Sequence, residues 1–271
     1  MRLFRSSLRK LTTRLATWLT FGLLAGLLAL IVLAVATGSG RGRGPSAEAL
    51  QLVTFPVAYD LILSFILGLG GLFAVVYGAA IAGSEWTWGT LKTSIARGES
   101  RSRYILTTFA AIAVVSAVGL LVAFGIGVAA AALGARIAGV SLDGIFDSET
   151  LGRLPEHLLR GWFAISAEGA IGFAIATLTR SQLAGIGAGI AFYFGETFAR
   201  IFLPDVVKYL PFDVANAAVG ATGGFRGGGG GGGGEPFAAL PADQALVLVA
   251  VWLIGSLVVA AGFTERADIT N

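Results

Sequence analysis

Long apolar stretches alternate with short polar segments along the chain. Six of these stretches reach the roughly 20 residues that a helix needs to cross the hydrocarbon core of a bilayer. They cover residues 15–36, 56–83, 105–133, 158–178, 183–203 and 241–263. The pattern predicts an all-α membrane protein with six transmembrane helices, folded as a single domain over residues 1–271.

The first apolar stretch has two interpretations. A basic segment precedes it, and Ala34-Val35-Ala36 resembles the cleavage site of a signal peptide. However, the stretch from Leu15 to Ala36 is longer than the roughly 7–15 apolar residues of a signal peptide. We therefore expect an uncleaved first span, with cleavage as the alternative.

Residues 1–14 show a different periodicity. Phe4, Leu8 and Leu11 recur at helical spacing, while cations occupy the other faces. This predicts an amphipathic helix at the membrane interface, which serves either as an anchor or as a contact arm for a partner.

Charge is scarce and unevenly distributed. Only 13% of the residues are charged and the mean hydropathy is +0.81, whereas a soluble protein is about a quarter charged. Cations gather before the first span and in residues 84–104, and most acids lie in the alternate loops, with Arg41 and Arg43 as exceptions. The positive-inside rule then predicts cytoplasmic termini in a bacterial-type plasma (inner) membrane. The net charge of +3 is explained by contact with the lipid bilayer and requires no nucleic acid partner.

The residue types needed for several kinds of chemistry are missing. The sequence has no cysteine and a single histidine, His157, which excludes the usual Cys/His zinc sites. No glycine precedes Lys10, Lys92 or Lys208, so the Walker A phosphate loop is absent, as is the G-x-S-x-G nucleophile motif. We expect no catalytic residues, metal or directly bound cofactor.

Glu168 lies near the middle of the fourth apolar stretch, where an ionised carboxylate facing lipid would be costly. It marks either a substrate or proton path or a structural hydrogen bond. We favour the structural role because a proton relay normally has further members within reach. Glu196 and Arg200, in the fifth stretch, have the i, i+4 spacing of an ion pair.

Small residues repeat every four positions in two of the spans, which lets helix backbones approach closely in lipid. The alternative is that apolar spans are simply rich in alanine and glycine. The predicted helix-packing residues are Ala74, Gly78, Ala82, Gly185 and Gly189.

Residues 204–240 form the last polar loop. Its first part, which includes "YLPFDVANAA", is amphipathic and predicts short helices that dip toward the membrane. The eight glycines Gly227 to Gly234 predict a flexible tether.

The segment "SEWTWGTLKTSIARGESRSRY", residues 84–104, separates the second and third spans. We expect Ser84 to cap a helix over about 85–97 that Gly98 ends. Trp88 and Leu91 would share one face of that helix. A helix that merely anchors the loop at the interface is the simpler interpretation.

This segment resembles the first cytoplasmic loop of type-2 ABC transporter permeases, which has an acidic residue, then G-T-L or a relative, then a basic ending of the G-x-S-R type. The matching residues are Glu85, Gly89, Thr90, Leu91, Arg97, Gly98, Ser100 and Arg103. The resemblance implies a coupling helix that docks on a separate ABC ATPase subunit. The expected contact residues are Glu85, Trp88, Leu91, Lys92, Arg97, Arg101 and Arg103.

The same resemblance implies a permease subunit of an ATP-driven exporter, paired with a second permease copy as a homodimer or heterodimer. ATP and Mg would be used by the ATPase, and substrate would pass between the second and fifth spans of the two permeases. Two alternatives stay open: a proton-coupled secondary transporter using Glu168, and a non-transporting scaffold that recruits a partner through residues 84–104.

Overall fold

A computed structural model describes residues 2–38, 50–219 and 240–267. All regular elements in these ranges are helical. The α-helices are α1 (Arg2–Thr13), α2 (Leu15–Gly38), α4 (Val57–Thr87), α5 (Thr90–Ala96), α6 (Arg101–Ala138), α7 (Ser148–Thr179), α8 (Gln182–Phe202), α9 (Pro204–Val207), α10 (Pro211–Val219) and α11 (Ala242–Arg266). Two 3₁₀ turns, Gln51–Val53 and Asp143–Phe146, lie among them. The predicted tether Gly227–Gly234 lies outside the described residues.

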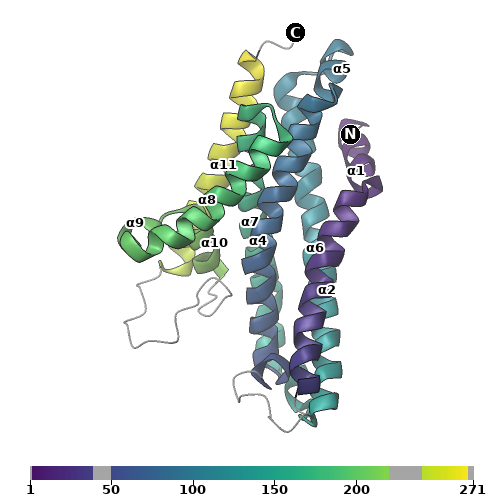
Figure 1. Ribbon diagram of the computed structural model, residues 1–271, viewed down its shortest axis with the longest axis vertical. Coiled ribbons are helices and arrows are strands. Elements are labelled where there is room, and N and C mark those ends of the chain that lie inside the picture. Colours follow the sequence, from purple (N-terminus) through teal and green to yellow (C-terminus); the bar gives the residue numbers. More distant parts are fainter. Residues whose placement is uncertain (1, 39–49, 220–239, 268–271) are drawn as a thin grey trace.

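Five of the described helices are long and apolar enough to cross a membrane: α2, α4, α6, α7 and α11. The prediction of an all-α, multi-pass membrane protein is therefore confirmed. The expected span over 183–203 forms α8, which carries Glu196 and Arg200 among its apolar residues and is not one of these five helices. Figure 1 shows α2, α4, α6 and α7 running side by side, whereas α8 inclines away from them.

The helices α4 and α7 approach so closely that only glycine fits at their contact. A Cβ atom on Gly78 would lie 2.1 Å from the carbonyl oxygen of Gly169, and one on Gly172 would lie 2.0 Å from that of Val75. Ala74 lies beside Gly169, since a Cβ on Gly169 would be 3.9 Å from the methyl group of Ala74. Close backbone approach of this kind gives dispersion contacts that lipid cannot replace.

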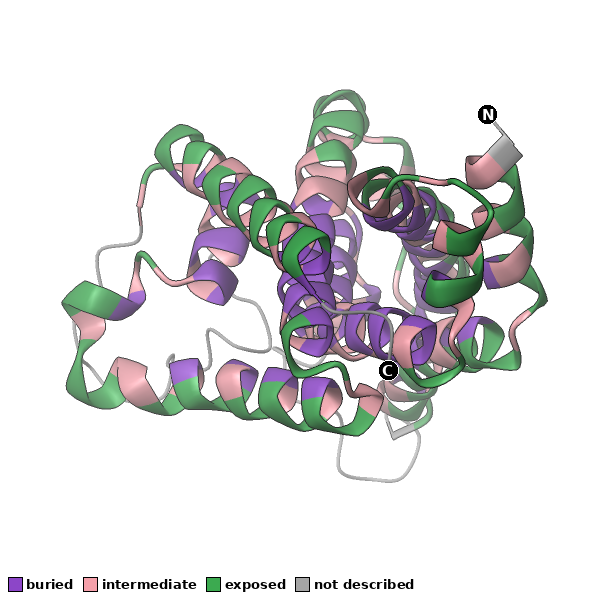
Figure 2. Ribbon diagram, turned by 90° about the horizontal axis from the view of Figure 1, so that it is seen from above, coloured by how far each residue is buried: buried purple, intermediate pink, exposed green. Residues whose placement is uncertain are grey.

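The predicted small residues of α8 also lie at helix contacts. A Cβ on Gly185 would be 2.4 Å from that of Ala176 in α7, and one on Gly189 would be 2.5 Å from Val75 in α4. Ala82, near the end of α4, is buried. Figure 2 shows buried residues where the long helices meet and exposed residues on their outer sides, where a membrane protein presents apolar groups to lipid.

The two charged side chains of α8 reach the short helix α10. The Glu196 carboxylate accepts hydrogen bonds from the backbone N–H groups of Phe212, at 3.3 Å, and Asp213, at 2.5 Å. Arg200 forms an ion pair with Asp213. Unsatisfied N–H groups at a helix start attract negative charge, so Glu196 stabilises the first turn of α10.

Asp147 caps the start of α7, outside the apolar part of the helix. The backbone N–H and the hydroxyl of Thr150 both donate to its carboxylate, at 2.9 and 2.6 Å. These two hydrogen bonds hold the pKa of the Asp147 carboxyl below its usual range. This cap fixes where α7 starts, ten residues before the apolar stretch that predicted it.

Candidate functional site

The segment 84–104 lies at the end of the bundle where α1, α5 and the end of α11 gather (Figure 1). The predicted single helix over 85–97 is wrong. Helix α4 continues through Ser84 to Thr87, so Ser84 does not cap a helix start. The chain then breaks at Gly89, whose φ of 64° is left-handed, before α5 begins.

The end of α5 is as predicted. Gly98 has a φ of 90°, and its N–H donates to the carbonyl of Ile95 at 2.9 Å. A glycine in this conformation ends a helix at no steric cost. The two glycines Gly89 and Gly98 therefore bound a short, separate helix.

The break changes the predicted aromatic face. Trp88 precedes α5 and is 63% exposed, whereas Leu91 lies within it and is fully buried. The two residues therefore do not share an exposed face, which corrects the expectation for Leu91 as a contact residue. Leu91 holds α5 against the bundle, and Trp88 is left on the surface.

Glu85 is the centre of a buried network. Its side chain is 1% exposed, and it pairs with Lys10 of α1 and accepts hydrogen bonds from Thr90 and Tyr104. Arg14 adds a second cation, with Nη2 3.9 Å from the carboxylate. Because its carboxylate is enclosed by residues of α1, α4, α5 and α6, Glu85 positions the loop and lies beneath its surface.

Arg14, which lies between α1 and α2, also contacts the exposed tryptophan. Its guanidinium donates to the Ser84 hydroxyl at 2.9 Å and lies 4.8 Å from the centre of the Trp88 ring. A guanidinium over an aromatic face is attractive, by about 0.5–1 kcal/mol at exposed sites. This contact orients Trp88 against the junction of α1 and α2.

A second cation–aromatic contact joins three more elements. The Arg180 guanidinium, between α7 and α8, lies 5.3 Å from the ring centre of Trp86 and 5.2 Å from that of Phe263 in α11. The two rings are themselves 6.4 Å apart. This cluster links the end of α4 to the α7–α8 turn and to α11.

Arg101 was expected to contact a partner, but the structure places it against α11. Its Nη1 donates to the carbonyls of Glu265 at 2.9 Å and Ala267 at 2.7 Å, and Ser102 donates to the Glu265 carboxylate. A cation at the end of a helix satisfies free carbonyls and the negative end of the helix dipole. Arg101 therefore fastens the start of α6 to the end of α11.

Four of the predicted contact residues are exposed: Trp88, Lys92, Arg97 and Arg103. Arg103 lies 4.0 Å from Glu99, an i, i+4 surface pair that is worth little. The surface of the segment thus carries one large aromatic ring and three cations, above a buried network that fixes their positions.

Glu168 lies inside the α4–α7 contact and is 4% exposed. A Cβ on Gly71 would come within 2.4 Å of its carboxylate, so the absence of a side chain at Gly71 makes room for it. Glu168 is therefore part of the packing between two long helices.

Sequence reasoning missed the roles of Lys10, Arg14, Arg180 and Tyr104 in this site. In the sequence, Lys10 and Arg14 are recognisable only as part of the cationic side of an amphipathic helix. Their partner Glu85 lies 70 or more residues later, and no local spacing reveals such a pair. The one available signal was Glu85 itself, an acid at the end of an otherwise apolar helix.

Together, the five apolar helices and the polar cluster at one end define a multi-pass α-helical membrane protein with a structured segment between its second and third long helices. The chain belongs to the family described as Protein of unknown function (DUF2705), whose model matches residues 26–260. The match begins inside α2 and ends inside α11, so it includes the 84–104 segment. No curated protein matches the chain.

Proposed function

We propose that this chain is the membrane subunit of an ATP-driven exporter of the type-2 ABC permease class. It acts with a separate ABC ATPase, which uses ATP and Mg, and with a second permease copy. Both termini and α5 face the cytoplasm of a bacterial-type cell. The chain itself carries no catalytic residue.

The observation that supports this proposal is the fastening of the 84–104 segment. Glu85 joins α1, α4, α5 and α6, and Arg180 joins the end of α4 to the α7–α8 turn and α11. A movement applied to α5 would therefore reach α1, α4 and α6 through the Glu85 network and, through the end of α4, the α7–α8 turn and α11. A segment that only anchored the chain to lipid would need no such connections.

The exposed surface of the segment has the chemistry of a protein contact. Trp88 offers a large, rigid ring, and aromatic and arginine residues dominate the binding energy of protein interfaces. Lys92, Arg97 and Arg103 give the same surface a positive charge, which favours an acidic groove on the ATPase. Glu85, Leu91 and Arg101 contribute by holding this surface in place.

In this proposal α8 is the fifth of six spans. Its contacts with α4 through Gly189 and Val75 place it beside the second span, where the resemblance puts the substrate path. Phe194 and Phe198 of α8 are exposed and offer an apolar surface to the second copy.

The test is co-purification with the ABC ATPase that the proposal expects to be encoded beside this protein and to carry a Walker A motif. Trp88→Ala and the double variant Lys92→Glu/Arg97→Glu should each lose the ATPase, because truncation of an interface aromatic costs about 2 kcal/mol or more. The matched control Arg136→Glu/Arg153→Glu makes the same charge change on two exposed residues, one in the last turn of α6 and one near the start of α7, at the other end of α6 from the segment. Full retention of the ATPase by the two segment variants would exclude the proposal.

A proton-coupled transporter predicts the opposite set of results. Export would follow the pH gradient without any ATPase and would be lost in Glu168→Gln. The packing position of Glu168 supports the contrary outcome, in which well-folded Glu168→Gln still exports.

A further inference from the structure

An apolar groove of about 370 Å³ runs between α1, α2 and α6. Leu8 and Thr12 lie at its α1 end. Its walls are residues of α2 and α6: Thr17, Trp18, Phe21, Gly22, Ala25, Val114, Val115, Val118, Gly119, Val122 and Ile126. Trp18 and Val118 are more than half exposed, so the groove opens on the outer side of the bundle.

The few polar groups in the groove are already used within the chain. The Thr17 hydroxyl donates to the Leu11 carbonyl at 2.7 Å, and the Thr12 hydroxyl donates to that of Arg9 at 3.1 Å. The Trp18 indole N–H donates to the Thr12 carbonyl at 2.8 Å. The groove therefore offers a ligand mainly hydrocarbon contacts.

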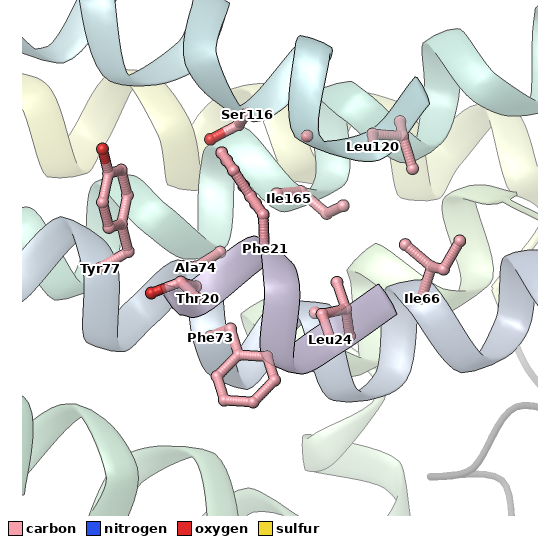
Figure 3. A pocket seen from close by; sticks show the side chains of 12 residues that line it. Thr20, Phe21, Leu24, Ile66, Phe73, Ala74, Tyr77, Ser116, Leu120 and Ile165 are labelled. Carbon is pink, nitrogen blue, oxygen red and sulfur yellow. The ribbon is translucent and has the colours of Figure 1, made fainter. Parts of the chain in front are cut away.

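Phe21 forms the floor of the groove. A Cβ on Gly119 would lie 2.2 Å from its ring, so the ring rests directly on the backbone of α6. Phe21 also lines a separate cavity of about 30 Å³ deeper in the bundle (Figure 3), where its ring lies among residues such as Thr20, Leu24 and Ile165. The ring thus separates the outer groove from the interior, and an occupant of the groove is held on the lipid-facing side.

The length of the groove matches one leaflet of a bilayer. From Val114 to Ile126, α6 rises about 18 Å at roughly 1.5 Å per residue. One leaflet of the hydrocarbon core is about 15 Å thick. A single acyl chain whose headgroup lies beside α1 would therefore run the length of the groove.

The charge of α1 selects the headgroup. Arg5, Leu8, Arg9 and Thr12 have the i, i+3, i+4, i+7 spacing of one helix face, and α1 contains no acidic residue. Two exposed arginines therefore lie on the same face as the residues at the groove's end. We propose that this groove is a binding site for one anionic phospholipid, with one acyl chain against α2 and α6 and its phosphate beside Arg5 and Arg9.

Such a lipid would stabilise the hydrogen-bond and ion-pair network around Glu85. Lys10 follows Arg9 directly and pairs with Glu85, so a lipid that holds α1 in place also holds the support of α5. The site does not depend on the identity of the transported substrate or on the presence of an ATPase. Loss of lipid binding and loss of ATPase binding are therefore separate outcomes.

Native mass spectrometry of the full chain in detergent tests the site, with phosphatidylglycerol added in small excess. The wild-type chain should retain one lipid. Gly22→Phe should bind it at least tenfold more weakly, because Gly22 lines the groove and nothing lies within 4 Å of a Cβ placed there, so the ring fills the groove without a clash at its Cβ. Gly255→Phe in α11 is the matched control: it also has nothing within 4 Å and should bind like the wild type.

Headgroup selection is tested in the same experiment. Arg5→Gln/Arg9→Gln should weaken phosphatidylglycerol binding on the order of thirtyfold, from the usual contribution of two cations near an anionic headgroup. Phosphatidylcholine should bind the wild-type chain no better than this double variant binds phosphatidylglycerol. Equal affinity of the wild type for both lipids would overturn the proposal of an anionic ligand.

The position of the acyl chain is tested by fluorescence. Phosphatidylglycerol brominated on its acyl chain should quench part of the tryptophan emission in detergent, and Trp18→Phe should remove that quenching because Trp18 lines the groove. Quenching that persists in Trp18→Phe, or lipid binding that Gly22→Phe leaves unchanged, would overturn the proposed site. Equal losses in Gly22→Phe and Gly255→Phe would do the same.

Discussion

The ammonium group of Lys10 donates to the carboxylate of Glu85, which lies 75 residues later in the chain and is only 1% exposed. This ion pair fastens the amphipathic helix α1 to the end of α4. Hydrogen bonds from Thr90 and Tyr104 extend the contact to α5 and α6. Four elements that are distant in sequence therefore depend on one buried carboxylate.

Glu85→Gln should destabilise the protein by about 2–3 kcal/mol, because it leaves the cations of Lys10 and Arg14 without their counter-charge. Thermal unfolding of the purified protein in detergent would measure this as a fall of roughly 5–10 °C in Tm. Hydrogen exchange should also speed up in α1. Among the described residues, the pair with Glu85 is the ion pair of α1, and the substitution removes it.

Glu99→Gln is the matched control for this charge removal. Glu99 faces Arg103 at 4.0 Å on the surface, where such pairs contribute about 0–1 kcal/mol. Its Tm should stay within about 2 °C of the wild type. Equal effects of the two substitutions would mean that the Glu85 network does not hold the segment together.

The long helices could be predicted from the sequence because apolar residues in a bilayer leave few other choices. Four of the five long apolar helices, α2, α4, α6 and α11, start within about four residues of the predicted span, whereas α7 starts ten residues earlier. The break at Gly89 could not be predicted, since apolar periodicity shows a helix face but not where the backbone turns left-handed. The partners of Glu85 depend on how α1 packs against α4, which no local pattern encodes.

The same reasoning applies to α8. Glu196 and Arg200 have the spacing of a local pair, yet each reaches α10, which follows them in the chain. The spacing singled out Glu196 and Arg200, but it could not show that their partners lie in α10. Sequence patterns therefore located the elements of the candidate site better than the contacts between them.

Arg180 provides a test of the cluster that it forms with Trp86 and Phe263. Its φ of 51° is left-handed, so Arg180→Gly relieves about 1 kcal/mol of backbone strain while it removes the guanidinium between Trp86 and Phe263. Because Arg180 is exposed, its two cation–aromatic contacts are worth about 1–2 kcal/mol together. We expect a net loss of up to about 1 kcal/mol in thermal unfolding, since the lost contacts slightly outweigh the relief. A gain in stability would show that the cluster contributes little, and Arg180→Lys, which keeps the charge and the strain, should fall between Arg180→Gly and the wild type.

Gly78 tests the close contact between α4 and α7. Gly78→Ala would place its Cβ 2.1 Å from the carbonyl oxygen of Gly169, an atom of the backbone that cannot move alone. The expected cost is about 1–3 kcal/mol from overpacking. Gly187→Ala in α8, where nothing lies within 4 Å, should be neutral or up to about 1 kcal/mol stabilising. Comparable stability of the two variants in detergent would contradict the close approach.

The orientation of the chain can be tested with single cysteines, since the sequence contains none. Thr93 is exposed on α5, whereas Ser94 is half-buried, and Ser141 is exposed in the turn after α6. Because α6 runs between these two positions, Thr93→Cys and Ser141→Cys should lie on opposite sides of the membrane.

A membrane-impermeant thiol reagent added to intact cells should label Ser141→Cys and not Thr93→Cys. Once the membrane is opened, Thr93→Cys should become labelled, and the co-expressed ATPase should protect it, because contact with lipid alone would not depend on that subunit. Labelling of Thr93→Cys from outside would place α5 beyond the reach of a cytoplasmic ATPase and would rule out the proposed exporter.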